Sequence, residues 1–178
     1  VAFDISEGLA RAACAGEVDG EVVDLRTVLD KDCELNILTA RDEKGLAVLR
    51  HTASHVLAQA VQNLYPEAKV AIGPSIDTGF YYDFECQSFS RDDLDAIEKE
   101  MKKIIKKGAK IERFTKSRED AIAFFKEKNE PYKVELIEDL PEGEEISFYS
   151  QGDWVDLCAG PHLMSTKGIK AFKLLSSS

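Results

Sequence analysis

The feature that most constrains the fold of this 178-residue chain is a helical apolar pattern that runs for five turns after Asp42. Asp42 is a typical helix N-cap, and Pro66 ends the pattern because proline lacks the amide hydrogen that a continuing helix needs. The apolar side chains recur three and four residues apart, at Leu46, Leu49, Ala53, Val56, Leu57, Ala60, Val61 and Leu64. The sequence therefore predicts one long core helix against which the other elements pack.

The segments around this helix are short and alternate between helices and hairpins. Before it, the patterns predict a helix over 6–15 with Ser6 as N-cap and Gly16 as stop, a hairpin turning at Asp19-Gly20, and a strand over 33–40. After it, they predict two strands around an Asp-Thr-Gly turn at 77–79, a helix over 90–108, a strand over 110–117, a helix over 117–129, two strands within 144–158, and a final strand over 169–176. Residues 131–140 have no clear pattern. Because no strand–helix–strand rhythm occurs, the order indicates an α+β fold with an antiparallel sheet and packed helices.

The first 42 residues read as a small mixed unit of their own. A unit of this size is too short to bury a good core alone. It therefore either rests against the remainder of the chain or lacks its beginning.

Charge and cysteine content exclude several classes of protein. The net charge of −10 argues against broad binding to phosphate backbones, although basic residues are concentrated between 98 and 118. A solvent-exposed helix face with Glu–Lys pairs four residues apart explains that concentration, with contact to a polyanion as the alternative. Four scattered cysteines without a Cys-x-x-Cys pair disfavour a disulfide framework. No apolar run approaches the ~20 residues of a membrane span, and the start does not resemble a signal peptide, so we expect a cytoplasmic protein without a membrane partner.

All three histidines fall into two short motifs. His51 and His55 are four residues apart on the predicted core helix, which places them on one face about 5–6 Å apart. His162 follows Cys158 by four residues, and the intervening Gly-Pro pair favours a tight loop. Three imidazoles and a thiol are the groups that a zinc site or a hydrolytic site uses, while satisfied core histidines are the alternative.

Several familiar catalytic motifs are absent. A metalloprotease helix needs Glu directly after its first histidine, where this chain has Thr52. The His-x-Glu and Cys-x-x-Cys elements of nucleoside deaminases do not occur. Neither a phosphate-binding P-loop nor a Gly-x-Ser-x-Gly elbow is present, so nucleotide triphosphate binding and α/β-hydrolase chemistry lack support.

Taken together, these motifs resemble the editing domain of bacterial-type threonyl-tRNA synthetases. The resemblance rests on His-x-x-x-His, the I-G-P…G-F-Y-Y-D hairpin, Y-K-V at 132–134 and D-L-C-A-G-P-H at 156–162, and it covers 43–178. Residues 1–42 resemble the later part of the ubiquitin-like β-grasp TGS domain, whose first hairpin this chain lacks. The family's aminoacylation domain would follow K-A-F-K-L-L-S, so the resemblance implies a chain that deacylates tRNA without charging it.

The resemblance implies that this domain hydrolyses mischarged seryl-tRNA(Thr) by water-mediated ester cleavage. Serine lacks one methyl group of threonine, a difference of only ~1–3 kcal/mol in a binding pocket, so a second site must remove the smaller amino acid. The implied partners are the acceptor 3′ end of tRNA(Thr) and the remainder of the synthetase chain. The implied residues are a catalytic group of His51, His55, Cys158 and His162 and a substrate-binding group of Tyr82, Lys133 and Asp156.

Two further questions stay open at the level of sequence. The same four His/Cys positions also resemble the editing domain of alanyl-tRNA synthetases, where such a set suggests zinc, but for the threonyl branch we expect no metal. A zinc-dependent hydrolase of small esters and a non-catalytic RNA-binding module are the alternative functions. Ala159 departs from the family pattern, in which arginine is common, so a charge that would meet RNA phosphate is absent at this position.

Overall fold

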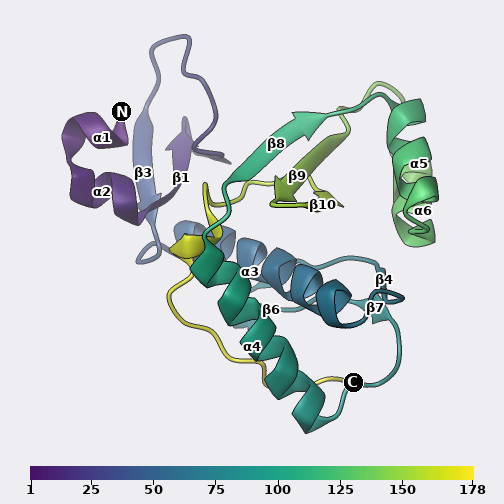
Figure 1. The fold of residues 1–178 in the computed structure, drawn as a ribbon. Coiled ribbons are helices and arrows are strands. Elements are labelled where there is room, and N and C mark those ends of the chain that lie inside the picture. Colours follow the sequence, from purple (N-terminus) through teal and green to yellow (C-terminus); the bar gives the residue numbers. More distant parts are fainter.

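The predicted core helix is present in the computed structural model, which describes residues 1–178, and it lies at the centre of the molecule (Figure 1). This helix, α3 (Glu43–Leu64), packs against α4 (Arg91–Lys107) through a shared cluster that includes Val56 and Ile97. Asp42 occupies the N-cap position, but its carboxylate accepts hydrogen bonds from the amide and hydroxyl of Thr39, at 2.7 and 3.1 Å, and not from the helix amides. Its role is therefore to join the helix to the preceding strand.

The N-terminal unit consists of two short helices followed by a three-stranded antiparallel sheet of order β2-β1-β3. Its elements are α1 (Ala2–Ile5), α2 (Glu7–Ala12), β1 (Ala13–Val18), β2 (Glu21–Val23) and β3 (Leu35–Thr39). Ser6 caps α2 as predicted, but the helix ends at Ala12 and Gly16 lies inside β1. The predicted stop at Gly16 was wrong because the backbone around it pairs with strands on both sides. The Asp19-Gly20 turn is confirmed, with φ of 50° and 89°.

This N-terminal unit has no separate core. Cys14, Ala15 and Leu38 belong to the same buried cluster as Val48 of α3. Gly45 of α3 lies so close to β3 that a Cβ atom there would be 2.1 Å from the Thr39 carbonyl oxygen. The unit therefore rests against the remainder of the chain.

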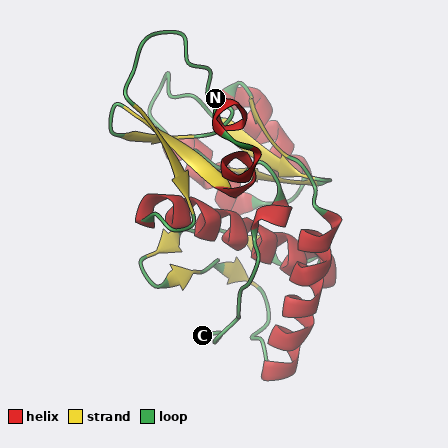
Figure 2. Cartoon of the chain, turned by 90° about the vertical axis from the view of Figure 1, so that its left-hand side faces the viewer, coloured by secondary structure: helices red, strands yellow, loops and turns green.

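A second antiparallel sheet, of order β10-β9-β8, lies between α3 and a pair of helices (Figures 1 and 2). Its strands are β8 (Ile111–Thr115), β9 (Ser147–Gln151) and β10 (Trp154–Leu157), and the covering helices are α5 (Arg118–Glu127) and α6 (Pro131–Asp139). Phe148 packs under α5 and α6, whereas its neighbour Tyr149 joins the α3 cluster, as the alternation of a strand requires. The α+β class is thus confirmed, and residues 131–140, without a clear pattern in sequence, form α6.

The predicted hairpin after α3 is present as two successive pairs of short strands, on the opposite side of α3 from the sheets (Figure 2). The outer pair is β4 (Lys69–Val70) with β7 (Phe84–Glu85), and the inner pair is β5 (Ser75–Ile76) with β6 (Gly79–Phe80). Between the pairs, the ring of Tyr82 crosses over Gly73, where a Cβ atom would lie only 2.0 Å from it. Backbone hydrogen bonds between Asp83 and both Ala71 and Ile72 continue between the two pairs, whose registers differ by one residue, and the Tyr82 side chain lies in the interior.

The ends of α4 match the prediction, but the end of the chain does not. Ser90 and Asp93 form a capping box, and Gly108 ends the helix with a φ of 64°. The predicted strand over 169–176 is absent: a 3₁₀ turn, η1 (Thr166–Gly168), is followed by irregular chain. The reason is that this segment bonds to a side chain, Glu98, which accepts the Leu174 amide at 2.8 Å. None of the helices is both long enough and apolar enough to cross a bilayer.

Candidate functional site

Four side chains that are far apart in the sequence converge beside the middle of α3. His51 and His55 come from α3, and Cys158 and His162 come from the loop that follows β10. One nitrogen or sulfur atom of each lies within 4.8 Å of the others. The Cys158 sulfur is 3.4 Å from Nε2 of His51 and 3.2 Å from Nε2 of His162. The structure thus brings together all four residues of the predicted catalytic group.

The loop reaches α3 because its backbone is tightly turned at Gly160. This residue has a φ of 78°, and a Cβ atom there would lie 2.1 Å from the hydroxyl oxygen of Tyr149. Its amide donates to the Cys158 sulfur at 3.3 Å. A side chain at this position would therefore clash with Tyr149 and displace the loop that carries His162.

The three predicted substrate-binding residues form a second group next to His55. Lys133 of α6 lies 2.8 Å from Oδ1 of Asp156, and its ammonium group donates to the Tyr82 hydroxyl at 3.0 Å. The Tyr82 hydroxyl in turn donates to Oδ2 of Asp156 at 2.6 Å. Oδ2 also lies 3.7 Å from Nε2 of His55, which joins the two groups. Lys133 and Asp156 are 2% and 1% exposed, so Lys133 is not a surface lysine.

Burial keeps the cluster uncharged. It lowers the pKa of His55 to about 3, and it lowers the pKa of His162 well below the ordinary histidine value. The pKa of His51 is also lowered by burial, partly offset by a hydrogen bond with the Pro161 carbonyl. Burial raises the pKa of the Cys158 thiol to about 12. The site therefore presents neutral imidazoles, which accept protons or bind metal, beside a protonated thiol.

Thr52 is a site residue that the sequence reasoning used only to exclude a metalloprotease. Its hydroxyl oxygen lies 2.9 Å from Nδ1 of His162 and accepts the Leu163 amide at 3.0 Å. Thr52 is fully buried, between the two histidines of α3 in sequence. The only sign of this role in the sequence is a hydroxyl residue on an apolar helix. Its partner, His162, is 110 residues away and could not be identified from the sequence.

Two aromatic rings complete the walls of the cluster. Tyr149 of β9 packs edge-on against His162 with ring centroids 4.6 Å apart, and Trp154 of β10 packs edge-on against His55 at 5.4 Å. Both were predicted as strand residues, and neither was predicted as part of the site.

The donor set is also suited to a metal ion. Zinc–nitrogen and zinc–sulfur bonds of about 2.0–2.3 Å put the ligands of a tetrahedral site ~3.5 Å apart. The two sulfur–nitrogen distances of 3.2 and 3.4 Å are close to that spacing. The four residues could therefore hold zinc, and with all four bound no tetrahedral position would be left for water.

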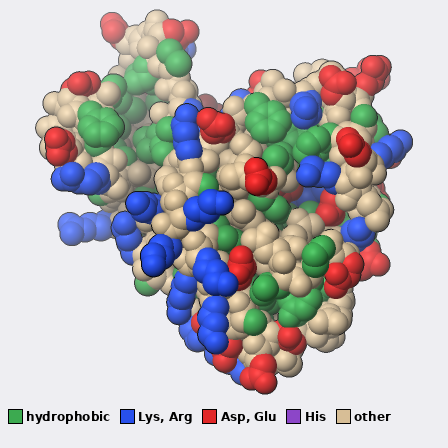
Figure 3. All heavy atoms as spheres, in the orientation of Figure 1, with side chains coloured by type: hydrophobic (Ala, Val, Ile, Leu, Met, Phe, Trp, Pro, Cys, Tyr) green, Lys and Arg blue, Asp and Glu red, His purple; other side chains and the backbone are tan.

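Most lysines of the basic segment over 98–118 lie on α4, where Figure 3 shows Lys and Arg side chains gathered on the surface. The lysines of α4 are exposed as expected, but the predicted Glu–Lys pairs four residues apart do not form within 4.0 Å. Glu98 points inward to Lys173 and so cannot pair with Lys102, and Glu100 pairs with Lys103, three residues on, at 3.4 Å.

Comparison with known proteins identifies two domains. A model described as the TGS domain matches residues 1–39, and a model described as the threonyl and alanyl tRNA synthetase second additional domain matches 146–178. Over 177 residues the chain is 66% identical to the threonine–tRNA ligase of Acetivibrio thermocellus, 62% to that of Clostridium botulinum and 59% to that of Caldanaerobacter subterraneus. These alignments cover 99% of this chain and 28% of each relative.

Proposed function

We propose that this chain, a homologue of threonine–tRNA ligases, is an editing module that hydrolyses seryl-tRNA(Thr), the product of mischarging with serine. The observation that carries the proposal is the convergence of His51, His55, Cys158 and His162 with the buried Lys133–Asp156 pair. Residues 43–178 would form this module and residues 1–42 the TGS-like unit. The partners would be the 3′ end of tRNA(Thr) and the remainder of a longer synthetase.

The chemistry is attack of water on the ester carbonyl that joins serine to the terminal ribose. The water oxygen bonds to the carbonyl carbon, one water proton passes to a neighbouring base, and the ribose oxygen leaves and takes up a proton. The products are serine and free tRNA(Thr). Because His51 is the least buried of the three neutral imidazoles, we assign it to orient the water and accept its proton.

The substrate-binding group has a complementary role. The Asp156 carboxylate would bind the amino group of the seryl moiety, the one positive charge on that part of the substrate. Lys133 holds Asp156 in place and would steady the water or contact the terminal adenosine, and Tyr82 shapes the pocket. His55, Cys158 and His162 would form the opposite wall.

This mechanism needs no cofactor, and zinc is the second candidate because the four donors suit it. When bound, zinc would supply a Lewis acid and would convert the Cys158 thiol to a thiolate. The side chains that would hold it are those of His51, His55, Cys158 and His162.

Deacylation of tRNA(Thr) charged with either serine or threonine tests the proposal. We expect release of serine but not of threonine. Hydrolysis of small free esters that requires added zinc would instead support a zinc-dependent esterase. Binding of tRNA without turnover of either ester would leave only an RNA-binding module.

A further inference from the structure

The N-terminal unit contacts the backbone of the loop that carries His162. The contact is made by Arg26, which follows β2 and is largely buried. Its guanidinium donates to the carbonyl oxygens of His162 at 3.2 Å and Leu163 at 2.8 Å. Its Nε also donates to the carbonyl oxygen of Ile111, at the start of β8, over a distance of 3.1 Å. One side chain thus ties the loop to a strand of the sheet.

Asp24 contacts the same loop from the same segment. Its Oδ2 accepts the Tyr149 hydroxyl at 2.6 Å and the His162 amide at 3.4 Å, while Oδ1 pairs with Arg26 at 2.5 Å. Burial and Asp24 raise the pKa of Tyr149, so its hydroxyl remains a donor. The Tyr149 ring packs against the His162 ring, as described for the cluster. Asp24 therefore orients both the backbone of His162 and the ring beside it.

The loop depends on these contacts more than the helix does. His51 and His55 are held by the backbone hydrogen bonds of α3, a helix of 22 residues. Residues 158–164 have no regular secondary structure, so the His162 and Leu163 carbonyls have no ladder partner. Loss of Arg26 would leave these buried carbonyls without their donor, and the hydrogen bonds of Thr52 would have to hold this part of the loop in place.

We propose that Asp24 and Arg26 are positioning residues that hold His162 against His51, which makes the TGS-like unit a structural part of the hydrolytic site. The inference rests on the proposed function for its effect on rate, but not for its effect on geometry. A displacement of about 1 Å in a catalytic group can lower a rate on the order of 100-fold. Truncation of Arg26 should therefore lower kcat, while KM changes little because the groups that bind the substrate stay in place.

Nuclear magnetic resonance of the three imidazoles tests the geometry, because each histidine gives its own signals and substitution of one at a time assigns them. In Arg26→Ala of the 178-residue chain we expect the largest shift or broadening at His162. Smaller changes should follow at His51 and His55, whose ring centroids lie 4.1 and 4.2 Å from that of His162. Arg26→Lys keeps the pair with Asp24 but cannot reach all three carbonyls at once, so it should give an intermediate shift. It also serves as the milder variant if Arg26→Ala does not fold.

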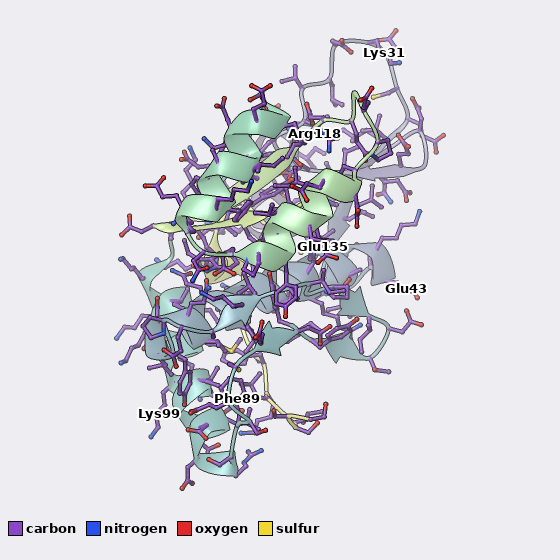
Figure 4. All side chains as sticks on the ribbon, turned by 90° about the vertical axis from the view of Figure 1, so that its right-hand side faces the viewer. Lys31, Glu43, Phe89, Lys99, Arg118 and Glu135 are labelled. Atoms are coloured by element: carbon purple, nitrogen blue, oxygen red, sulfur yellow. The ribbon has the colours of Figure 1, made fainter.

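Arg118→Ala is the matched control. Arg118 also binds three carbonyls, those of Ile137, Leu140 and Pro141, but it lies at the start of α5, on the other side of the sheet from α3 (Figure 4). Its loss should destabilise the chain in a similar way without moving the His162 signals. If Arg118→Ala shifts them equally, or if Arg26→Ala changes all three histidines alike or none, the positioning role is wrong.

Kinetics of serine release supply the second readout. We expect kcat of Arg26→Ala to fall on the order of 10- to 100-fold, with KM for seryl-tRNA(Thr) within about twofold of the unsubstituted chain. An unchanged kcat, or a loss confined to KM, contradicts the proposal. If the unsubstituted chain releases no serine, the proposed function fails, and the His162 signals alone then decide whether Arg26 positions the loop.

Discussion

The hydroxyl oxygen of Thr52 lies 2.9 Å from Nδ1 of His162, so the core helix and the Cys/His loop are joined by a direct hydrogen bond. The same oxygen accepts the Leu163 amide, which leaves the hydroxyl proton free to be donated to Nδ1. In that arrangement the proton of the neutral imidazole is on Nε2 and points to the Cys158 sulfur, 3.2 Å away. Thr52 thereby influences which nitrogen of His162 carries the proton.

Replacement of Thr52 by valine should disrupt this junction. Thr52→Val preserves the shape of the side chain but leaves the buried Leu163 amide and Nδ1 of His162 without a partner. We expect a loss of about 1–3 kcal/mol in the free energy of unfolding, measured with urea, and a clear drop in serine release. Thr52→Ser, which keeps the hydroxyl, should restore most of both. A valine variant as active and as stable as the unsubstituted chain would show that the hydroxyl is dispensable.

Removal of the least buried histidine should abolish deacylation without loss of the fold. His51→Ala deletes the group that we assign to the attacking water, while α3 retains its buried apolar face. The control is Asn63→Ala on the same helix, because Asn63 is exposed and bonds only to Glu100. Serine release is measured together with circular dichroism. Deacylation that continues unchanged in His51→Ala would refute the site assignment.

The buried pair of Lys133 and Asp156 should show strong coupling. Lys133→Met leaves the Asp156 carboxylate buried without its counter-ion, and we expect a loss of about 3–5 kcal/mol in the free energy of unfolding. The double variant Lys133→Met/Asp156→Asn contains no unpaired charge and should recover much of that stability. Both should be inactive, because the group that would bind the seryl amino group is disturbed or absent. Additive losses in the double variant would indicate that the pair is not coupled.

The end of the chain should detach from α4 in acid. The hydrogen bond from Lys173 is the main cause that lowers the pKa of Glu98, and the Leu174 amide acts in the same direction. Because the folded-state pKa is the lower one, this stabilisation is complete above the unfolded-state pKa and is lost as pH falls through the folded-state value. Hydrogen-exchange protection of the Leu174 amide should therefore decrease from about pH 5 downward.

A matched pair of variants checks that Glu98 is responsible for this pH dependence. Glu98→Gln keeps an acceptor but does not titrate, so protection at Leu174 should no longer depend on pH. Glu100→Gln, two residues further along the same helix and paired with Lys103 and not with the end of the chain, should retain the dependence of the unsubstituted chain. Equal behaviour of the two variants would assign the effect to another group.

Deacylation should survive treatment with a chelator. A zinc ion bound by all four His/Cys side chains would leave no vacant tetrahedral position for the attacking water. We expect metal analysis of protein prepared without EDTA to find less than one zinc per chain. One tightly held zinc per chain, whose removal stops serine release, would contradict the metal-free mechanism.

The elements that the sequence predicted correctly depend on residues close together in the chain. The period of apolar side chains determined α3, the Ser90–Asp93 capping box and Gly108 determined α4, and Asp19-Gly20 determined the first hairpin. The His-x-x-x-His spacing likewise placed His51 and His55 on one face, because a helix fixes the relation between such residues regardless of what surrounds it.

Errors arose where the backbone found its partner far away in the sequence. The helix predicted to end at Gly16 stops at Ala12, because the next residues form β1, which pairs with both β2 and β3. The last predicted strand is absent because the Leu174 amide bonds to the side chain of Glu98, 76 residues earlier. Local propensity carries no information about these encounters.

By itself, the sequence determined the long core helix and the α+β order of elements, since both follow from the spacing of residues close together in the chain. The seven residues of the predicted site came from the two His/Cys motifs and from the resemblance to an editing domain, and the tertiary structure brings them together. Only the tertiary structure decided that Thr52, Tyr149, Asp24 and Arg26 support that site. Arg26 lies 136 residues from His162, and its partners in the loop are backbone carbonyls, which every residue possesses. Such a contact leaves no pattern in the chain, because hydrogen bonds to the main chain depend on where the fold brings two segments together and not on which side chains the receiving segment carries.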